Sequence, residues 1–197
     1  PPPPPHTFTP VYDGKRFRLL SRGPGDGFNR YFEIFNPTSD TVILDDYAWA
    51  RVGGNPTTIG VYETWNDFAP GAVILPNDIY IVAHSNSDAF IINQADMISQ
   101  LLSNGDDGLA LVHGDEPLTP THPDSGLYTI LDWIGDWNGD PGSAWDVAGV
   151  TNATKDHTLV RKCEIFSGNT DWMASAGTSE QDSEWIVLDI DDWSFLG

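Results

Sequence analysis

Short runs of alternating apolar and polar side chains recur along most of this chain. In residues 29–35, Phe32 and Ile34 face one way on an extended backbone, while Tyr31 and Glu33 face the other. Clusters of Gly, Pro, Asn and Asp separate the runs and indicate turns. Similar runs predict further strands at 16–20, 41–44, 47–52, 72–75, 79–84, 109–113, 128–134, 156–164 and 184–188.

One stretch, residues 88–102, has helical spacing instead. Its apolar positions recur every three or four residues, and Ser87 is placed to cap it. These positions are Ile91, Ile92, Ala95, Ile98 and Leu102. We therefore expect a short or broken helix over one end of a sheet. Many short strands with so little helix predict an all-β fold, an immunoglobulin-like β-sandwich with one short helical segment.

The chain has 197 residues, which suits one domain with a single core. Its five opening prolines favour an extended spacer, so we divide the chain into a Pro-rich leader and edge segment, residues 1–27, and a β-sandwich domain, residues 28–197. Because it opens at Pro1 and not at Met, we expect it to be a processed or excised piece. The single cysteine, Cys163, is expected to be a small buried hydrophobe.

The formal net charge is −20, from 29 acidic and 9 basic residues. Binding to phosphates needs a basic surface, so this charge argues against nucleic acid as a direct partner. Cations, by contrast, are attracted. No apolar run reaches the roughly 20 residues of a membrane helix, and we expect no membrane insertion.

The acidic loop that follows residue 132 is the strongest candidate for metal binding. Asp136, Asn138 and Asp140 alternate on a turning backbone, and Asp146 follows nearby. Calcium takes six to eight oxygen ligands in loose geometry, so these four residues are our candidate ligands for a structural Ca²⁺. The alternative is a metal-free loop of Asx turns, because Pro141 and Val147 stand where the helix-flanked calcium loop has Gly and an acid.

No nucleophile elbow, zinc-protease motif or phosphate-binding glycine loop occurs in the sequence. Asp156 and His157 are adjacent on an expected strand, so their side chains point to opposite faces and do not form a catalytic pair. We expect His157 to make a local hydrogen bond, and Arg161 and Lys162 to pair with acidic loops. The chain is therefore not expected to be an enzyme.

Several phrases resemble those of the bacterial-type lamin tail domain, an immunoglobulin-like family. The resemblance covers roughly residues 28–197 and lies in 31–38 (YFEIFNPT), 101–111 (LLSNGDDGLAL), 145–150 (WDVAGV), 156–162 (DHTLVRK), Gly168-Asn169, Trp172 and Glu184-Trp185. It implies a non-catalytic accessory domain that is secreted or attached to the cell surface. The partner would be an extracellular protein or polysaccharide.

Eight tryptophans leave two alternatives open. Exposed rings beside acids stack on sugars, which makes Trp137, Trp65 and Trp193 candidates in a carbohydrate-binding accessory domain. Trp145, Trp172 and Trp185 lie in the family phrases and are expected to anchor the core. The other alternative is a repeating subunit of an extracellular fibre or coat, which self-assembles through a donated leader or edge strand.

Overall fold

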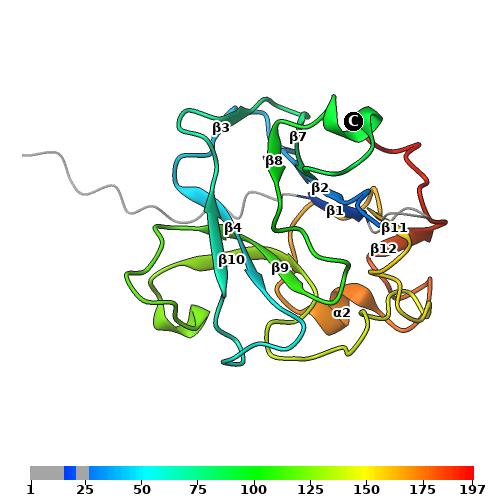
Figure 1. The fold of residues 1–197 in the computed structure, drawn as a ribbon. Helices are drawn as coiled ribbons and strands as arrows, with labels where there is room; N and C mark the ends of the chain where they lie inside the picture. Colours follow the sequence, from blue (N-terminus) through cyan, green and yellow to red (C-terminus); the bar gives the residue numbers. More distant parts are fainter. Residues whose placement is uncertain (1–15, 21–26) are drawn as a thin grey trace, which may run out of the picture.

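The structure, a computed structural model, describes residues 16–20 and 27–197 (Figure 1). The proline-rich segment therefore lies outside the described residues. The strands are β1 (Arg16–Leu20), β2 (Tyr31–Phe35), β3 (Val42–Ile43), β4 (Tyr47–Val52), β5 (Thr64–Asp67), β6 (Val73–Ile74), β7 (Ile79–His84), β8 (Met97–Ser99), β9 (Gly108–His113), β10 (Thr129–Ile134), β11 (Thr158–Arg161) and β12 (Trp185–Leu188). The helices are α1 (Ala89–Ile92), α2 (Trp172–Ala176) and a 3₁₀ turn, Pro123–Ser125.

The strands form a six-stranded sheet in the order β12-β11-β1-β2-β7-β8, a four-stranded sheet in the order β10-β9-β4-β5, and a small β3-β6 pair. Among the described strands, every pairing is antiparallel except that of β7 with β8. The two larger sheets face each other across the core, where Phe32 of β2 meets Trp49 of β4 edge to face at 5.6 Å. The all-β, sandwich-like fold predicted from the alternating pattern is confirmed.

The outer face of the six-stranded sheet carries a second, smaller core. Tyr31, Ile81 and Ala83 point outward there, and Ile91 of α1 packs on them. The C-terminal segment completes the cover through Trp193 and Leu196. Figure 1 shows this segment running from β12 towards α1.

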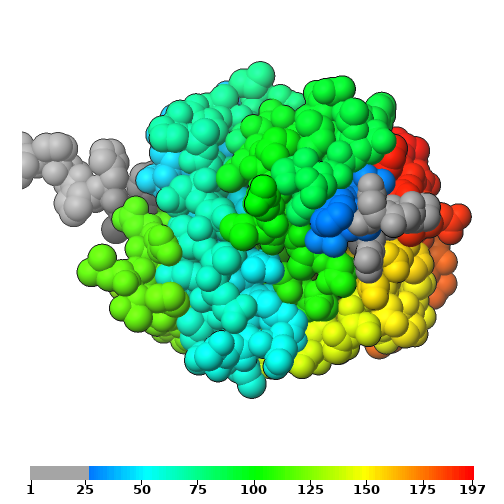
Figure 2. Space-filling model, in the orientation of Figure 1, coloured from blue at the N-terminus to red at the C-terminus, as the bar shows by residue number. Residues whose placement is uncertain are grey.

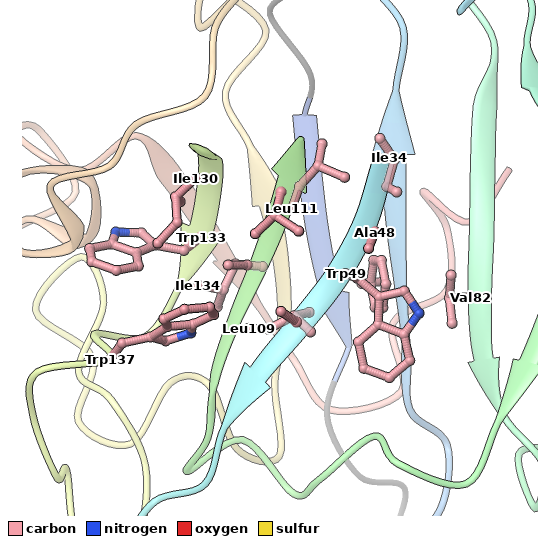
Figure 3. Close-up of a cluster of buried hydrophobic side chains, with 14 of the residues drawn as sticks. Ile34, Ala48, Trp49, Val82, Leu109, Leu111, Ile130, Trp133, Ile134 and Trp137 are labelled. Atoms are coloured by element: carbon pink, nitrogen blue, oxygen red, sulfur yellow. The ribbon is translucent and has the colours of Figure 1, made fainter. Parts of the chain in front are cut away.

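Aromatic rings cover the outer face of the four-stranded sheet. Residues that pair directly on neighbouring strands lie on the same face of the sheet. The outer face of this sheet has small residues, which include Ala48, Ala50, Gly108 and Ala110. Over it lies the aromatic shell, which we define as Tyr62, Trp65, Tyr128, Trp133 and Trp137. Figure 3 shows Trp133 and Trp137 on the opposite side of β9 from Trp49.

A β-bulge in β10 decides which side Asp132 faces. Ile130 pairs with Val112, but Asp132 pairs with Leu111, so Leu131 is the extra residue. Because the bulge shifts the alternation by one position, Asp132 turns inward with Leu111, towards the other sheet. Without the bulge, its carboxylate would point into the aromatic shell.

Three predictions about elements need correction. The strand at 16–20 is present, but β1 lies between β11 and β2 and so is not an edge strand. The helix in 88–102 is short, as expected, and ends at Ile92, but its cap is Asp88 instead of Ser87, and β8 occupies residues 97–99. β8 exists because its backbone pairs with β7, and this tertiary pairing overrides the helical spacing.

Cys163 is exposed, contrary to prediction, because it follows the end of β11 in a turn. Among the described residues, no helix is long and apolar enough to cross a membrane.

Candidate functional site

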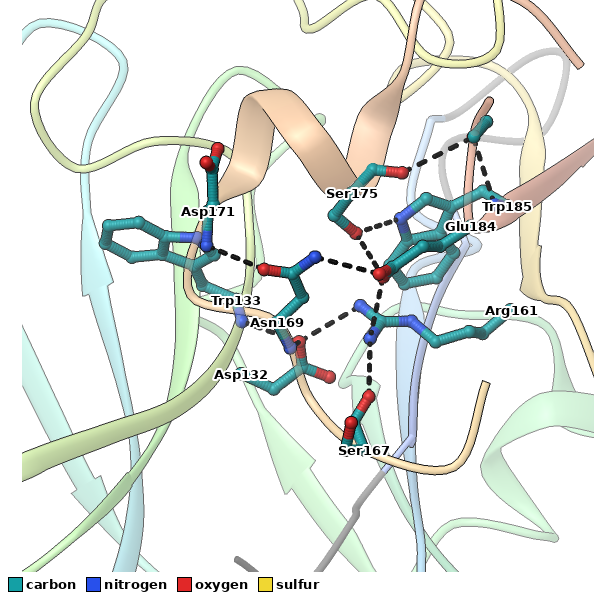
Figure 4. A network of polar contacts seen from close by, with 10 residues as sticks. Asp132, Trp133, Arg161, Ser167, Asn169, Asp171, Ser175, Glu184 and Trp185 are labelled. Carbon is teal, nitrogen blue, oxygen red and sulfur yellow. Dashed lines mark hydrogen bonds and ion pairs between the residues drawn. The ribbon is translucent and has the colours of Figure 1, made fainter. Parts of the chain in front are cut away.

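A group of charged side chains lies inside the sandwich (Figure 4). Asp132 of β10 and Arg161 of β11 are both fully buried, and their Oδ1 and Nη2 atoms lie 3.0 Å apart. The guanidinium of Arg161 also lies 3.4 Å from Glu184 and stacks over the ring of Trp185 at 4.2 Å. This pair therefore joins the two sheets directly.

A loop and α2 supply the rest of this buried ionic network, which we define as Asp132, Arg161, Asn169, Ser175 and Glu184. The backbone N–H of Asn169 donates to Asp132 at 3.0 Å, and its side-chain amide donates to Glu184 at 2.8 Å. The Ser175 hydroxyl donates to Glu184 and accepts from the Trp185 indole, both at 2.9 Å. The network therefore links strands β10 and β11, the loop that contains Asn169, and helix α2.

Gly168 is required for this close approach. A Cβ atom added there would lie 2.2 Å from the Leu131 carbonyl oxygen. The phrase Gly168-Asn169 thus has a packing role, since only glycine lets the loop reach β10.

Burial raises the pKa of Asp132 to about 6, against the opposing effects of Arg161 and the Asn169 N–H. The three hydrogen bonds to this carboxylate all end on Oδ1, from Arg161, Asn169 and Trp133. Oδ2 is buried and accepts no hydrogen bond from the described residues. The network has two acids for one arginine, which favours uptake of a proton by the buried Asp132 in mild acid.

Of the residues predicted to bind calcium, Asp136 and Asn138 share one turn, where the Asn138 amide also donates to Asp136 at 3.2 Å, while Asp140 and Asp146 bond elsewhere. Asp136 Oδ1 accepts the backbone N–H of Asn138 at 2.8 Å, and Asp140 Oδ1 accepts that of Gly142 at 2.7 Å. Asp146 Oδ1 accepts the N–H of Asn152 at 2.8 Å. The first two are Asx-turn bonds, which are the metal-free alternative. In the part of the chain that the structure describes, no three His, Cys, Asp or Glu residues gather as a metal group.

Calcium binding therefore stays a prediction from sequence. Calorimetric titration of chelator-treated protein tests it, together with the melting temperature with and without calcium. Saturable heat and a higher melting temperature would support it, and the absence of both would contradict it.

The tryptophans predicted to stack on sugars differ in exposure. Trp137 is fully buried in the aromatic shell and donates to the Gly108 carbonyl at 2.9 Å, so its ring is closed to a sugar and this prediction is wrong. Trp65 is half-buried between Tyr62 and Tyr128, and its indole donates to Asp67 at 2.8 Å. Trp193 is half-buried under Phe90.

Phe90 and Trp193 form what we call the surface stack. Their ring planes are 16° apart and their centroids are 5.8 Å apart. Phe90 is 52% exposed, so it presents an aromatic surface to solvent. Sequence reasoning missed Phe90, because in an expected helix an apolar residue beside Ile91 is assigned to packing.

The predictions for the core and the 156–162 segment hold in part. The strand expected over 156–164 covers only Thr158–Arg161, so Asp156, with a φ of 60°, and His157 precede it and do not alternate as strand neighbours. Trp172 and Trp185 are buried as expected, while Trp145 is half-buried. His157 makes the expected local contact, with Nδ1 2.9 Å from the Lys155 carbonyl oxygen. Lys162 donates to the backbone carbonyl of Glu180.

A small pocket of about 20 Å³ lies beside Arg30, Arg51 and Asp107, which gives room for about one water molecule. Arg51 is paired with Asp107, and Arg30 Nη1 donates to the Leu102 carbonyl at 2.8 Å. Through these contacts, both arginines hold neighbouring loops in place.

Comparison with protein-family models and with curated proteins finds no match for this chain. The resemblance to lamin tail domains thus rests on the quoted phrases, and the case for function rests on the geometry described above.

Proposed function

We propose that this chain is a non-catalytic binding module that works outside the cell and attaches to an extracellular protein or polysaccharide. The buried ionic network is the observation that carries the proposal. The side chains of Asp132 and Arg161 are closed to solvent and bonded to each other. A molecule at the surface would therefore touch neither of these two side chains.

The surface supports the same function. The acids of the 136–146 loop bond to their own turns, and the surface stack offers an exposed aromatic ring. Exposed aromatic rings are common anchors in binding surfaces. The extracellular setting rests on the resemblance to lamin tail domains, which is also the finer assignment that we propose for this sandwich.

Co-sedimentation with isolated cell-envelope and extracellular-matrix fractions of the source organism tests this function. We expect saturable, reversible binding of the folded chain. The bound material should be recovered unchanged, with no release of soluble peptides or sugars. Binding no stronger than that of the heat-unfolded chain would contradict the proposal, and so would release of degraded matrix.

A further inference from the structure

We propose that the surface stack, Phe90 over Trp193, is a stacking subsite for the sugar rings of a neutral polysaccharide. This inference rests on the proposed function as a binding module and names the chemistry of its partner. The C–H face of a sugar ring packs on an aromatic face, and nearby polar groups then orient its hydroxyls.

The stack is held firmly from below. Trp193 packs on the second core with Ile81 and Ile91, and Phe90 lies on the Trp193 ring. The side chain of Asn29 donates to Asp191 at 3.3 Å, which fastens the C-terminal segment two residues before Trp193. Because the rings are already ordered, binding would cost little conformational entropy. Figure 2 shows the residues around α1 and the C-terminal segment side by side on one face.

Polar groups beside the exposed ring match sugar hydroxyls. The Gln94 side-chain amide donates to the Phe90 carbonyl at 3.1 Å, so an amide lies one helical turn from the ring. Asp88 is exposed at the start of α1 and uses Oδ1 to accept the Phe90 N–H at 2.8 Å. Carboxylate and amide groups accept hydrogen bonds from sugar hydroxyls.

Charge selects neutral polysaccharides over acidic ones. The chain carries a net charge of −20, which repels polyanions at low and moderate salt. No basic residue occurs in the last turn of α1. A sulfated or uronic-acid glycan would therefore lack a cation on this helix.

Affinity electrophoresis through gels that contain xylan, mixed-linkage β-glucan or galactomannan tests the subsite, with calorimetry on any polysaccharide that retards the chain. We expect at least one to bind. Phe90→Ala should weaken that binding about tenfold, the upper range for one stacking contact. Phe90→Tyr should retain it, since the ring is kept.

Two matched variants serve as controls. Phe166→Ala removes a ring that is 66% exposed elsewhere on the surface, and it should bind like the unchanged chain. Trp65→Ala removes the half-buried ring at β5 and should lower stability without changing the affinity. Circular dichroism confirms that each variant is folded at the assay temperature.

Binding that is absent for all three polysaccharides, or equal in the unchanged chain and Phe90→Ala, would overturn the inference. If the chain still binds envelope or matrix in that case, the proposed function stands and the partner is bound elsewhere than at the surface stack. If it binds neither, both proposals fail.

Discussion

At the scale of single residues, the stability of the fold depends on the pair Asp132 and Arg161, because either charge would be costly to bury alone. Removing one partner of a buried ion pair leaves the other charge uncompensated. We predict that Asp132→Ala lowers the free energy of unfolding by about 3–5 kcal/mol, as measured by urea denaturation. Asp140→Ala, in an exposed turn, should cost far less. Similar losses in the two variants would contradict a supporting role for the network.

The pH dependence of stability gives a second test of Asp132. Its pKa is about 6 in the folded chain and 3.8 without the fold, so the protonated form is favoured by folding. This contribution is complete below the unfolded value and is lost as the pH rises through about 6. Asn at this position does not titrate. We therefore predict that the unchanged chain gains stability relative to Asp132→Asn as the pH falls from 7 to 5.

Denaturation of both proteins at several pH values between 5 and 7 measures this difference. A difference that stays flat over this range would contradict the assignment, because it would mean that Arg161 keeps Asp132 ionised throughout. Comparing the two proteins at each pH removes the contribution of the other acids, which both share.

Sequence reasoning placed Arg161 on a strand but did not find its partner. Alternation predicts that adjacent residues point to opposite faces, and a single extra residue such as Leu131 reverses that assignment. Nothing in the local pattern signals the bulge. The calcium candidates show a different limit of sequence patterns. Asp136 and Asp140 have the spacing of metal ligands in the sequence, but in the structure their carboxylates bond within separate turns.

At the scale of elements, the outer face of the four-stranded sheet depends on small residues beneath the aromatic shell. A Cβ atom at Gly108 would lie 2.6 Å from Cδ1 of Trp137. We predict that Gly108→Ala destabilises the fold by about 1–3 kcal/mol, as overpacking does, and changes tryptophan fluorescence. At Gly53 the nearest atom, 2.7 Å away, is the Glu63 carboxylate, which can move.

Gly53→Ala is therefore the matched control and should have little effect. Equal effects of the two substitutions would show that backbone entropy, and not contact with Trp137, governs both sites.

β2 and β7 were predicted closely from sequence because each is a short, mostly apolar run bounded by turn residues, with one face in the main core and the other in the second core. β5 and α2 were missed. β5 lies in a segment without clear alternation and forms because β4 pairs with it. α2 has only five residues and depends on the Asp171 cap and on burial of Trp172. Both elements are stabilised by the assembled fold more than by local propensity.

At the scale of the whole molecule, a net charge of −20 on 197 residues means that folding brings many acids together. Screening shortens the range of this repulsion from about 30 Å at 0.01 M salt to about 10 Å at 0.1 M. We predict that the free energy of unfolding in urea rises over that range of sodium chloride. A fall would mean that ion pairs such as Arg51 with Asp107 outweigh the general repulsion.

The central claim is that the buried ionic network holds the fold while binding occurs at the surface. The most direct test is the affinity of the unchanged chain and of Asp132→Asn for the same envelope or matrix fraction, measured where both are folded. We predict equal affinities together with different free energies of unfolding. Loss of binding by folded Asp132→Asn would contradict it, because the network would then be part of the functional site.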